Sequence, residues 1–230
     1  MFQNILTYIV IAFTVFTSGC SSDPFGGNKN EGKIIYSIVY DEMEIDALSR
    51  SMLPSEAEFY FTKDKSTLIL SGAGNLFRFS MIADNKKKIV IQELKIMSKK
   101  VKAVFNDRDV FYYQDHPGFT ILETGYSDTI AGFRGDVSLI IFDDISSREF
   151  PIVHTSEIKM NDPNWYSLYK EIPSVLLQYE YMQFGKKFKM RAKSVEFIKV
   201  DKTIFEANLD YLDITPEDLM EELEKLASSM

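Results

Sequence analysis

The sequence predicts a mainly β protein with a few helices, an α+β fold in one domain. Short runs of strand type recur along the chain, turn-forming residues separate them, and helical periodicity is confined to three places. The 230 residues, with 45% hydrophobic and 13% aromatic content, are enough to bury one substantial core. Short strands in succession, joined by tight turns, indicate an antiparallel meander.

The charge balance argues against nucleic-acid binding. The chain has 26 basic and 34 acidic residues, a formal net charge of -8 and a pI near 4.9. Affinity for a polyphosphate depends on clustered Lys and Arg that release counterions, and an acidic domain repels DNA. No nucleic-acid partner is therefore expected.

The first nineteen residues form a separate segment without Asp, Glu, Lys or Arg. Ile5–Phe16 is a run of twelve apolar or near-apolar residues, whereas about twenty are needed to span a bilayer. The small residues Thr17, Ser18 and Gly19 follow, which is typical of a signal peptide and not of a transmembrane helix. We therefore expect residues 1–19 to be a signal peptide.

The only cysteine of the chain, Cys20, comes next. This arrangement resembles a bacterial lipobox, which implies a diacylglycerol group on the Cys20 thiol, cleavage before Cys20 and acylation of its new amine. Acyl chains, at about 0.8 kcal/mol per buried methylene, would hold the protein on a membrane. The alternatives are a buried or a redox-active thiol, which the polar surroundings of Cys20 disfavour. Residues 20–31 are then the lipidated cysteine and a flexible tether, and residues 32–230 are a single domain.

The domain opens with a strand over Lys33–Asp41. One of its faces carries Ile34, Tyr36, Ile38 and Tyr40, and the other carries Ile35 and Val39. Further runs of strand type, with turn residues between them, are Glu56–Lys63, Ser66–Ser71, Leu76–Ala83, Ile89–Ile96, Val101–Phe105, Phe119–Glu123 and Val137–Phe142.

The clearest hairpin joins Val175–Phe184 to Phe188–Val200. In its return strand the odd positions are basic up to Lys193, and the same parity becomes apolar at Val195. An inward-facing strand cannot change phase in this way without an extra residue, so we expect a β-bulge near residues 193–195. The alternative is an edge strand that passes from solvent to core without a bulge.

Helical spacing is found over residues 45–52, before Pro54, and over residues 165–172, before Pro173. The third helix begins with Thr215 as N-cap and Pro216 at the first helical position. Its expected apolar stripe is Leu219, Met220, Leu223, Leu226 and Ala227, and Glu221, Glu222 and Glu224 are expected to face water.

Three stretches carry a resemblance to a known family: GKIIYSIVY at 32–40, TIAGFRG at 129–135 and FEANLDYLDITPEDL at 205–219. They resemble an uncharacterised family of envelope lipoproteins, which is similar to the LolA/LolB superfamily of lipoprotein carriers and outer-membrane receptors. The resemblance covers roughly residues 32–226. It implies a strongly curved antiparallel sheet, an incomplete barrel, whose hollow is covered by a few helices and can receive acyl chains. It transfers no enzymatic residues.

Alternating aromatic residues give separate support for a hollow. Phe59, Phe61, Phe77, Phe79 and Met81 fall on alternate positions of adjacent predicted strands, so those of each strand project to one side. Leu177, Tyr179 and Tyr181 share a face of the hairpin, and the helix carrying Trp165 could cover an opening. These nine residues are the candidate ligand-binding set. The alternative is an ordinary filled core.

A search for chemistry finds no catalytic or metal-binding signature. His116 and His154 are far apart in the sequence, and His116 lies in a turn-like Asp-His-Pro-Gly stretch. Residues 106–109 lack the glycine and glutamate of a calcium loop and are expected to be a hairpin tip. The lysines at 86–88 and near residue 100 are expected to guard strand ends, with anionic lipid headgroups as the alternative partner.

These observations predict a non-enzymatic lipoprotein of the cell envelope, without cofactor or metal. We expect it to be anchored in the outer membrane through Cys20, on the periplasmic face, and to bind a lipid or an acylated partner in its hollow. The alternative function is an envelope protein with a filled core that acts through surface contacts with other proteins.

Overall fold

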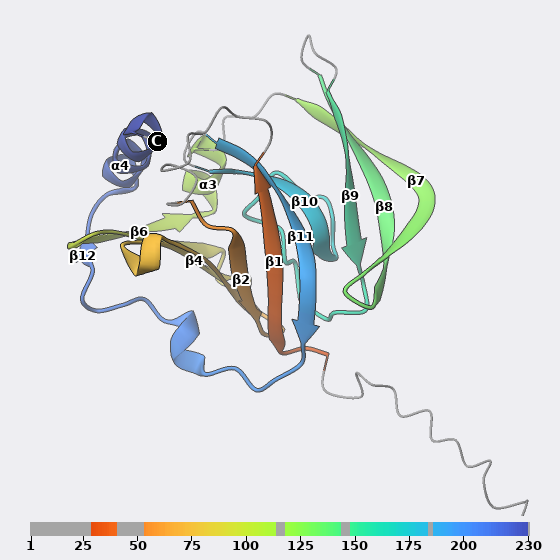
Figure 1. The fold of residues 1–230 in the computed structure, drawn as a ribbon, viewed down its shortest axis with the longest axis horizontal. Coiled ribbons are helices and arrows are strands. Elements are labelled where there is room, and N and C mark those ends of the chain that lie inside the picture. Colours follow the sequence, from red (N-terminus) through yellow and green to blue (C-terminus); the bar gives the residue numbers. More distant parts are fainter. Residues whose placement is uncertain (1–28, 41–52, 114–117, 144–147, 184–185, 230) are drawn as a thin grey trace, which may run out of the picture.

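The computed structural model describes residues 29–40, 53–113, 118–143, 148–183 and 186–229. The predicted signal peptide, Cys20, most of the tether, the helix expected over 45–52 and His116 lie outside these residues. Most of the described chain is β-strand (Figure 1).

The twelve strands of the described residues belong to one open sheet. Their bounds are β1 (Gly32–Tyr40), β2 (Glu56–Phe61), β3 (Lys65–Gly72), β4 (Phe77–Asp84), β5 (Ile89–Ile96), β6 (Lys99–Asn106), β7 (Phe119–Ile130), β8 (Phe133–Phe142), β9 (Glu149–Thr155), β10 (Val175–Gln183), β11 (Lys186–Glu196) and β12 (Leu212–Asp213). Their order in space is β12-β6-β5-β4-β3-β2-β1-β11-β10-β9-β8-β7. Only β12 runs parallel to its neighbour, β6, and β1 joins the two antiparallel meanders by pairing with both β2 and β11.

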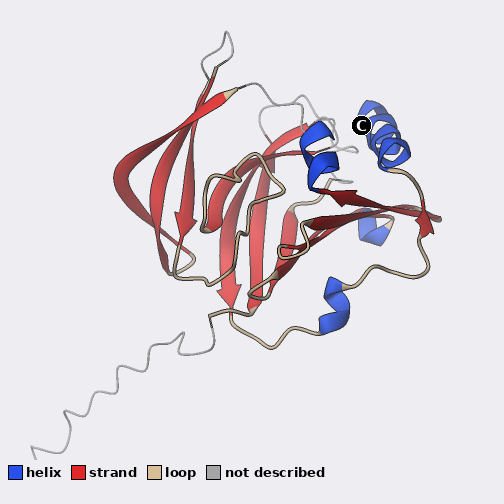
Figure 2. Cartoon of the chain, turned by 180° about the vertical axis from the view of Figure 1, so that it is seen from behind, coloured by secondary structure: helices blue, strands red, loops and turns tan. Residues whose placement is uncertain are grey.

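The prediction of a strongly curved sheet, an incomplete barrel of LolA/LolB type covered by a few helices, is wrong. The sheet is not closed, and the described residues form two α-helices, α3 (Asp107–Tyr113) and α4 (Pro216–Ser229), with two short 3-10 segments, η1 (Ala73–Asn75) and η2 (Lys202–Phe205). In Figure 2 the helices lie around the margin of the sheet, and an irregular loop crosses its face instead.

The loop that crosses the sheet is residues 156–174, which include the segment predicted as a helix. This segment forms successive turns, in which the amides of Ser167, Lys170 and Ile172 each bond to the carbonyl three residues earlier. Side chains compete with helical bonding: the Ser167 hydroxyl donates to the Asn164 carbonyl and accepts from the Tyr169 amide. Local polar side chains therefore override the apolar spacing.

The strand predictions are confirmed within a few residues up to β6, and Ile89–Ile96 is correct at both ends. The hairpin of β10 and β11 is present, and so is the bulge. Ile35 pairs with Ser194 and Tyr36 pairs with Ala192, so Lys193 is the extra residue. The change of parity in the sequence thus located the bulge correctly.

Strand β9 was not predicted, and β7 and β8 are longer than expected. Pro151 interrupts the strand pattern of β9. In β7 the pairing with β8 shifts register between Glu123 and Ser127, where Gly125 has φ +71°. The exposed second half of β7 has no apolar alternation, because it forms one edge of the sheet.

The main core lies on one side of the sheet, which we call the inner face. Loop 156–174 covers most of it, and Val110 of α3 and Leu219 and Leu223 of α4 complete it. It contains the alternating residues Ile34, Tyr36 and Ile38 of β1. Phe61, Phe79 and Leu177 are fully buried there, together with Trp165 from the loop. A smaller core contains Ile140, Phe142, Phe150, Ile152, Tyr169, Ile172 and Leu176.

The outer face is crossed by residues 197–214, which we call the C-terminal strap. Thr67 of β3 is buried and donates to the carbonyl of Ile204 in η2 (2.9 Å). Further along, Glu93 of β5 is 1% exposed and accepts two bonds from Asn208, one from its backbone amide and one from Nδ2, both 2.6 Å. The strap ends in β12, which covers the edge of β6.

Helix α4 begins as predicted. The Thr215 hydroxyl accepts the Asp218 amide (3.1 Å), and Leu219 and Leu223 are buried on the predicted stripe. Glu222 departs from its expected exposure because it pairs with Lys99. The hairpin tip expected at residues 106–109 is wrong, since β6 ends at Asn106 and helix α3 begins at Asp107.

Candidate functional site

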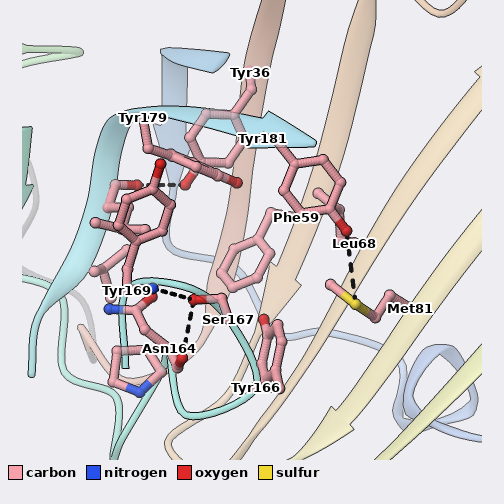
Figure 3. Close-up of a pocket in the computed structure, with 13 residues that line it drawn as sticks. Tyr36, Phe59, Leu68, Met81, Asn164, Tyr166, Ser167, Tyr169, Tyr179 and Tyr181 are labelled. Carbon is pink, nitrogen blue, oxygen red and sulfur yellow. Dashed lines mark hydrogen bonds between the residues drawn. The ribbon is translucent and has the colours of Figure 1, made fainter. Parts of the chain in front are cut away.

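An aromatic cavity lies between the inner face and loop 156–174 (Figure 3). The strands contribute Tyr36, Phe59, Leu68, Met81, Val175, Leu176, Tyr179 and Tyr181, and the loop contributes Pro163, Asn164, Tyr166, Ser167 and Tyr169. These strands are neighbours in the sheet although residues 36 and 181 are far apart in sequence, because β1 lies between β2 and β11.

Tyr179 is the centre of the aromatic cluster. Its ring meets those of Tyr36, Tyr169 and Tyr181 edge to face, with centroids 5.7, 5.8 and 6.4 Å away. Such pairs place the positive edge of one ring against the negative face of the next, which stabilises the cluster beyond simple burial.

The hydroxyl groups of these tyrosines are not equally satisfied. Tyr36 donates to the Leu176 carbonyl and Tyr169 to the Glu180 carbonyl, each at 2.6 Å. Tyr181 has only a weak bond to the Met81 sulfur, at 3.8 Å. The Tyr179 hydroxyl has no hydrogen-bond partner among the described residues, and Figure 3 shows it pointing into the space between the rings.

The cavity is electrically neutral. No Asp, Glu, Lys, Arg or His lines it. Burial raises the pKa of Tyr36, Tyr179 and Tyr181 well above the usual value of 10.0, so these hydroxyls stay protonated. A charged group placed here would lose its hydration without gaining a counterion.

The loop is fixed in place by side-chain amides. Asn164 Nδ2 donates to the carbonyls of Ile172 (2.7 Å) and Ser174 (2.9 Å), which ties the two ends of the turn segment together. Trp165 Nε1 donates to Asn85 Oδ1 of the β4–β5 turn (3.1 Å). These hydrogen bonds hold the loop, which forms one wall of the cavity, in place against the sheet.

The nine candidate ligand-binding residues are divided by the structure. Phe59, Met81, Tyr179 and Tyr181 line the cavity. Phe61, Phe77, Phe79, Leu177 and Trp165 are buried in the core and do not line it. Among the residues that the prediction missed, Tyr36 is on the correct face of its predicted strand, so its alternation was a usable signal. Tyr169 belonged to the helical spacing predicted over residues 165–172, and Tyr166 carried no signal, because the segment forms irregular turns.

The cavity is small. Its water-accessible volume is about 40 Å³. Since one ordered water needs roughly 10–15 Å³ on this measure, it has room for about three waters. It can receive a short apolar group, but a whole long acyl chain does not fit in this conformation.

His154 is the other feature with chemical potential. Its ring lies between the Ser138 hydroxyl (3.0 Å from Nε2) and the Ser174 hydroxyl (2.6 Å from Nδ1), and burial lowers its pKa. Both contacts tie strands and loop together. Over the described ranges, no group of three or more His, Cys, Asp or Glu side chains could hold a metal ion. In the same residues, no helix combines the length and apolar character needed to cross a bilayer.

Comparison with known proteins gives a likeness to solved structures. No family model matches the sequence, and no curated protein matches it. A solved structure described as "Structure of PNGF-II in C2 space group" is similar, with a TM-score of 0.54 and 14% identity, over 85% of this chain and 33% of that one. This chain therefore spans about a third of its neighbour's length. At this identity the likeness concerns the fold alone, and it gives no support for a LolA-like family.

Proposed function

We propose that this protein is a non-enzymatic lipoprotein, anchored in the outer membrane through Cys20 on the periplasmic face, that binds a small, neutral apolar group in its aromatic cavity. The Tyr179 hydroxyl carries this proposal, because it is directed into a cavity whose lining is mainly aromatic and aliphatic. The segment before Cys20 and its surroundings support the anchor.

The walls define the chemistry of the ligand. Aromatic rings and Met81 favour an apolar body, the volume of about 40 Å³ limits it to a few heavy atoms, and the absence of charged lining residues favours a neutral one. The Tyr179 hydroxyl then favours a carbonyl or hydroxyl beside the apolar part. A short section of a lipid or an acylated peptide around its ester or amide carbonyl has this character.

Methyl resonances of methionine provide a direct test. In protein with labelled methionine methyls, we expect methyl acetate, a small neutral ester, to shift the Met81 resonance, and acetate, which is charged, to leave it in place. Tyr179→Phe should weaken the binding of the ester by about 2- to 10-fold, the equivalent of one neutral hydrogen bond. Tyr126→Phe is the matched control, because Tyr126 is 76% exposed on β7.

The rival function is a protein with a filled core that acts through surface contacts. The small volume of the cavity and the complete burial of Phe61, Phe79 and Leu177 favour it. If neither probe shifts the Met81 resonance, the cavity is a packing defect without a ligand, and a function through surface contacts with other proteins replaces the proposal.

A further inference from the structure

One end of the domain is assembled from four segments that are distant in sequence. The Asn85 amide in the β4–β5 turn bonds to the Asp64 carbonyl in the β2–β3 turn, at 2.9 Å. Asn161 in turn bonds to Lys63 (2.7 Å), and Lys159 bonds to Lys29, just before β1 (2.9 Å). We call residues 29–31, 62–65, 84–88 and 157–162 the basic end. It lies at the foot of β1 in Figure 1.

The basic end has a net positive charge, opposite in sign to that of the whole chain. Its four segments contain seven lysines and five acidic residues, whereas the whole chain has a net charge of -8. Lys63, Lys86, Lys87 and Lys159 are exposed. Positive charge is therefore concentrated on one surface of an acidic protein.

Local ion pairs occupy three of the five acidic residues. Asp64 pairs with Lys86 (2.9 Å), Glu157 pairs with Lys29 (3.6 Å), and Asp162 pairs with Lys88. Asp84 caps its own turn by accepting the amides of residues 86 and 87. Lys63 and Lys87 are exposed and form no ion pair within 4 Å with any described residue, although the charge of Lys63 also acts on the neighbouring Asp64. Both ammonium groups can therefore reach a partner.

The position of this end relative to the proposed anchor identifies the partner. Lys29 is nine residues after Cys20, and nine residues span at most about 30 Å when fully extended. A lipidated Cys20 would therefore keep the basic end close to the bilayer. Exposed lysines are attracted to anionic headgroups within about a Debye length of the surface, which is about 8 Å at physiological salt.

We infer that the basic end docks on the surface of the membrane that carries the anchor, with Lys63 and Lys87 against anionic lipid headgroups. This inference rests on the anchoring part of the proposed function and is separate from the cavity. Docking would set the orientation of the domain, with β1 rising away from the bilayer.

The single tryptophan can report the docking, because Trp165 contacts the basic end. Its indole bonds to Asn85, and the Lys88 ammonium lies 5.0 Å from the centre of its ring. The lipidated full chain would be reconstituted in phosphatidylcholine vesicles, with or without phosphatidylglycerol, that contain a dansyl-labelled lipid. We expect stronger energy transfer from Trp165 to dansyl in the anionic vesicles, and loss of the difference at about 1 M salt.

Two double variants with equal charge change complete the experiment. Lys63→Glu with Lys87→Glu should abolish the difference between the vesicles. Lys95→Glu with Lys225→Glu should retain it, because Lys95 is near the opposite end of β5 and Lys225 is on α4. Far-UV circular dichroism would check that both variants are folded.

The outcomes separate the two proposals. Equal transfer in both kinds of vesicle, or equal loss in both double variants, would overturn docking while leaving the anchor intact. A protein that does not associate with neutral vesicles at all would overturn the anchor, and docking with it.

Discussion

Asn208→Ala tests the attachment of the C-terminal strap to the outer face. The Glu93 carboxylate is 1% exposed, and Asn208 supplies it with two hydrogen bonds of 2.6 Å. Alanine retains the backbone donor and removes the side-chain donor. A hydrogen bond to a charged group contributes about 1.5–3 kcal/mol, so we expect the free energy of unfolding to fall by about 2 kcal/mol. That is a large part of the roughly 5–15 kcal/mol that stabilises a domain.

Urea denaturation followed by circular dichroism would measure this loss as a lower midpoint at constant slope. Leu209→Ala is the neighbouring control. Leu209 is 95% exposed, so its truncation should change stability by less than about 0.5 kcal/mol. Hydrogen exchange adds a local readout, because the Ile214 amide bonds to the Lys102 carbonyl (2.9 Å) and should exchange faster when the strap loosens. If Asn208→Ala and Leu209→Ala behave alike in both assays, the bonds to Glu93 do not hold the strap.

Three further predictions concern stability. Leu223→Asp puts a charge on the buried stripe of α4 and should cost about 3 kcal/mol or more in urea denaturation, whereas Glu221→Gln on its exposed side should cost less than about 0.5 kcal/mol. Gly135→Ala should lower the free energy of unfolding by about 1–3 kcal/mol, because its Cβ would lie 2.6 Å from a valine methyl of β9. Asp136→Ala, at the exposed neighbouring position, is the control. Equal melting temperatures of the two variants would disprove the clash. Burial lowers the pKa of His154 below 6.5, so the unfolded chain binds a proton more readily than the folded one, and the free energy of unfolding should fall as the pH drops below about 6.5. His154→Asn should flatten that part of the plot of unfolding free energy against pH. An unchanged plot would refute the assignment.

The sequence predicted those features that depend on neighbouring residues. Alternation located most strands, and the parity change at Lys193 located the bulge, because side-chain direction along a strand is a local property. The capping of α4 by Thr215 is equally local. Each of these signals can be read within about ten residues of chain.

Features that depend on distant partners were missed or wrong. The segment around Trp165 has helical spacing, yet Asn164 and Ser167 hold it in turns against the sheet. The strap has no periodic pattern of its own, because its course is set by buried partners such as Glu93. Only part of the cavity lining could be predicted. Phe59 and Met81 belong to predicted strands, whereas the opposite wall comes from the irregular loop, whose course depends on distant partners.

The two edges of the sheet are protected in different ways. The edge strand β6 is covered by the chain's own β12, so part of its backbone is already paired. No strand of the described residues covers β7, but its bulge divides the ladder into Phe119–Glu123 and Ser127–Ile130. A strand from a second molecule could pair only with these two short stretches of the twelve-residue edge, and their hydrogen-bonding registers differ. Because long regular edges template aggregation, the irregularity at Gly125 protects the folded protein from pairing with copies of itself.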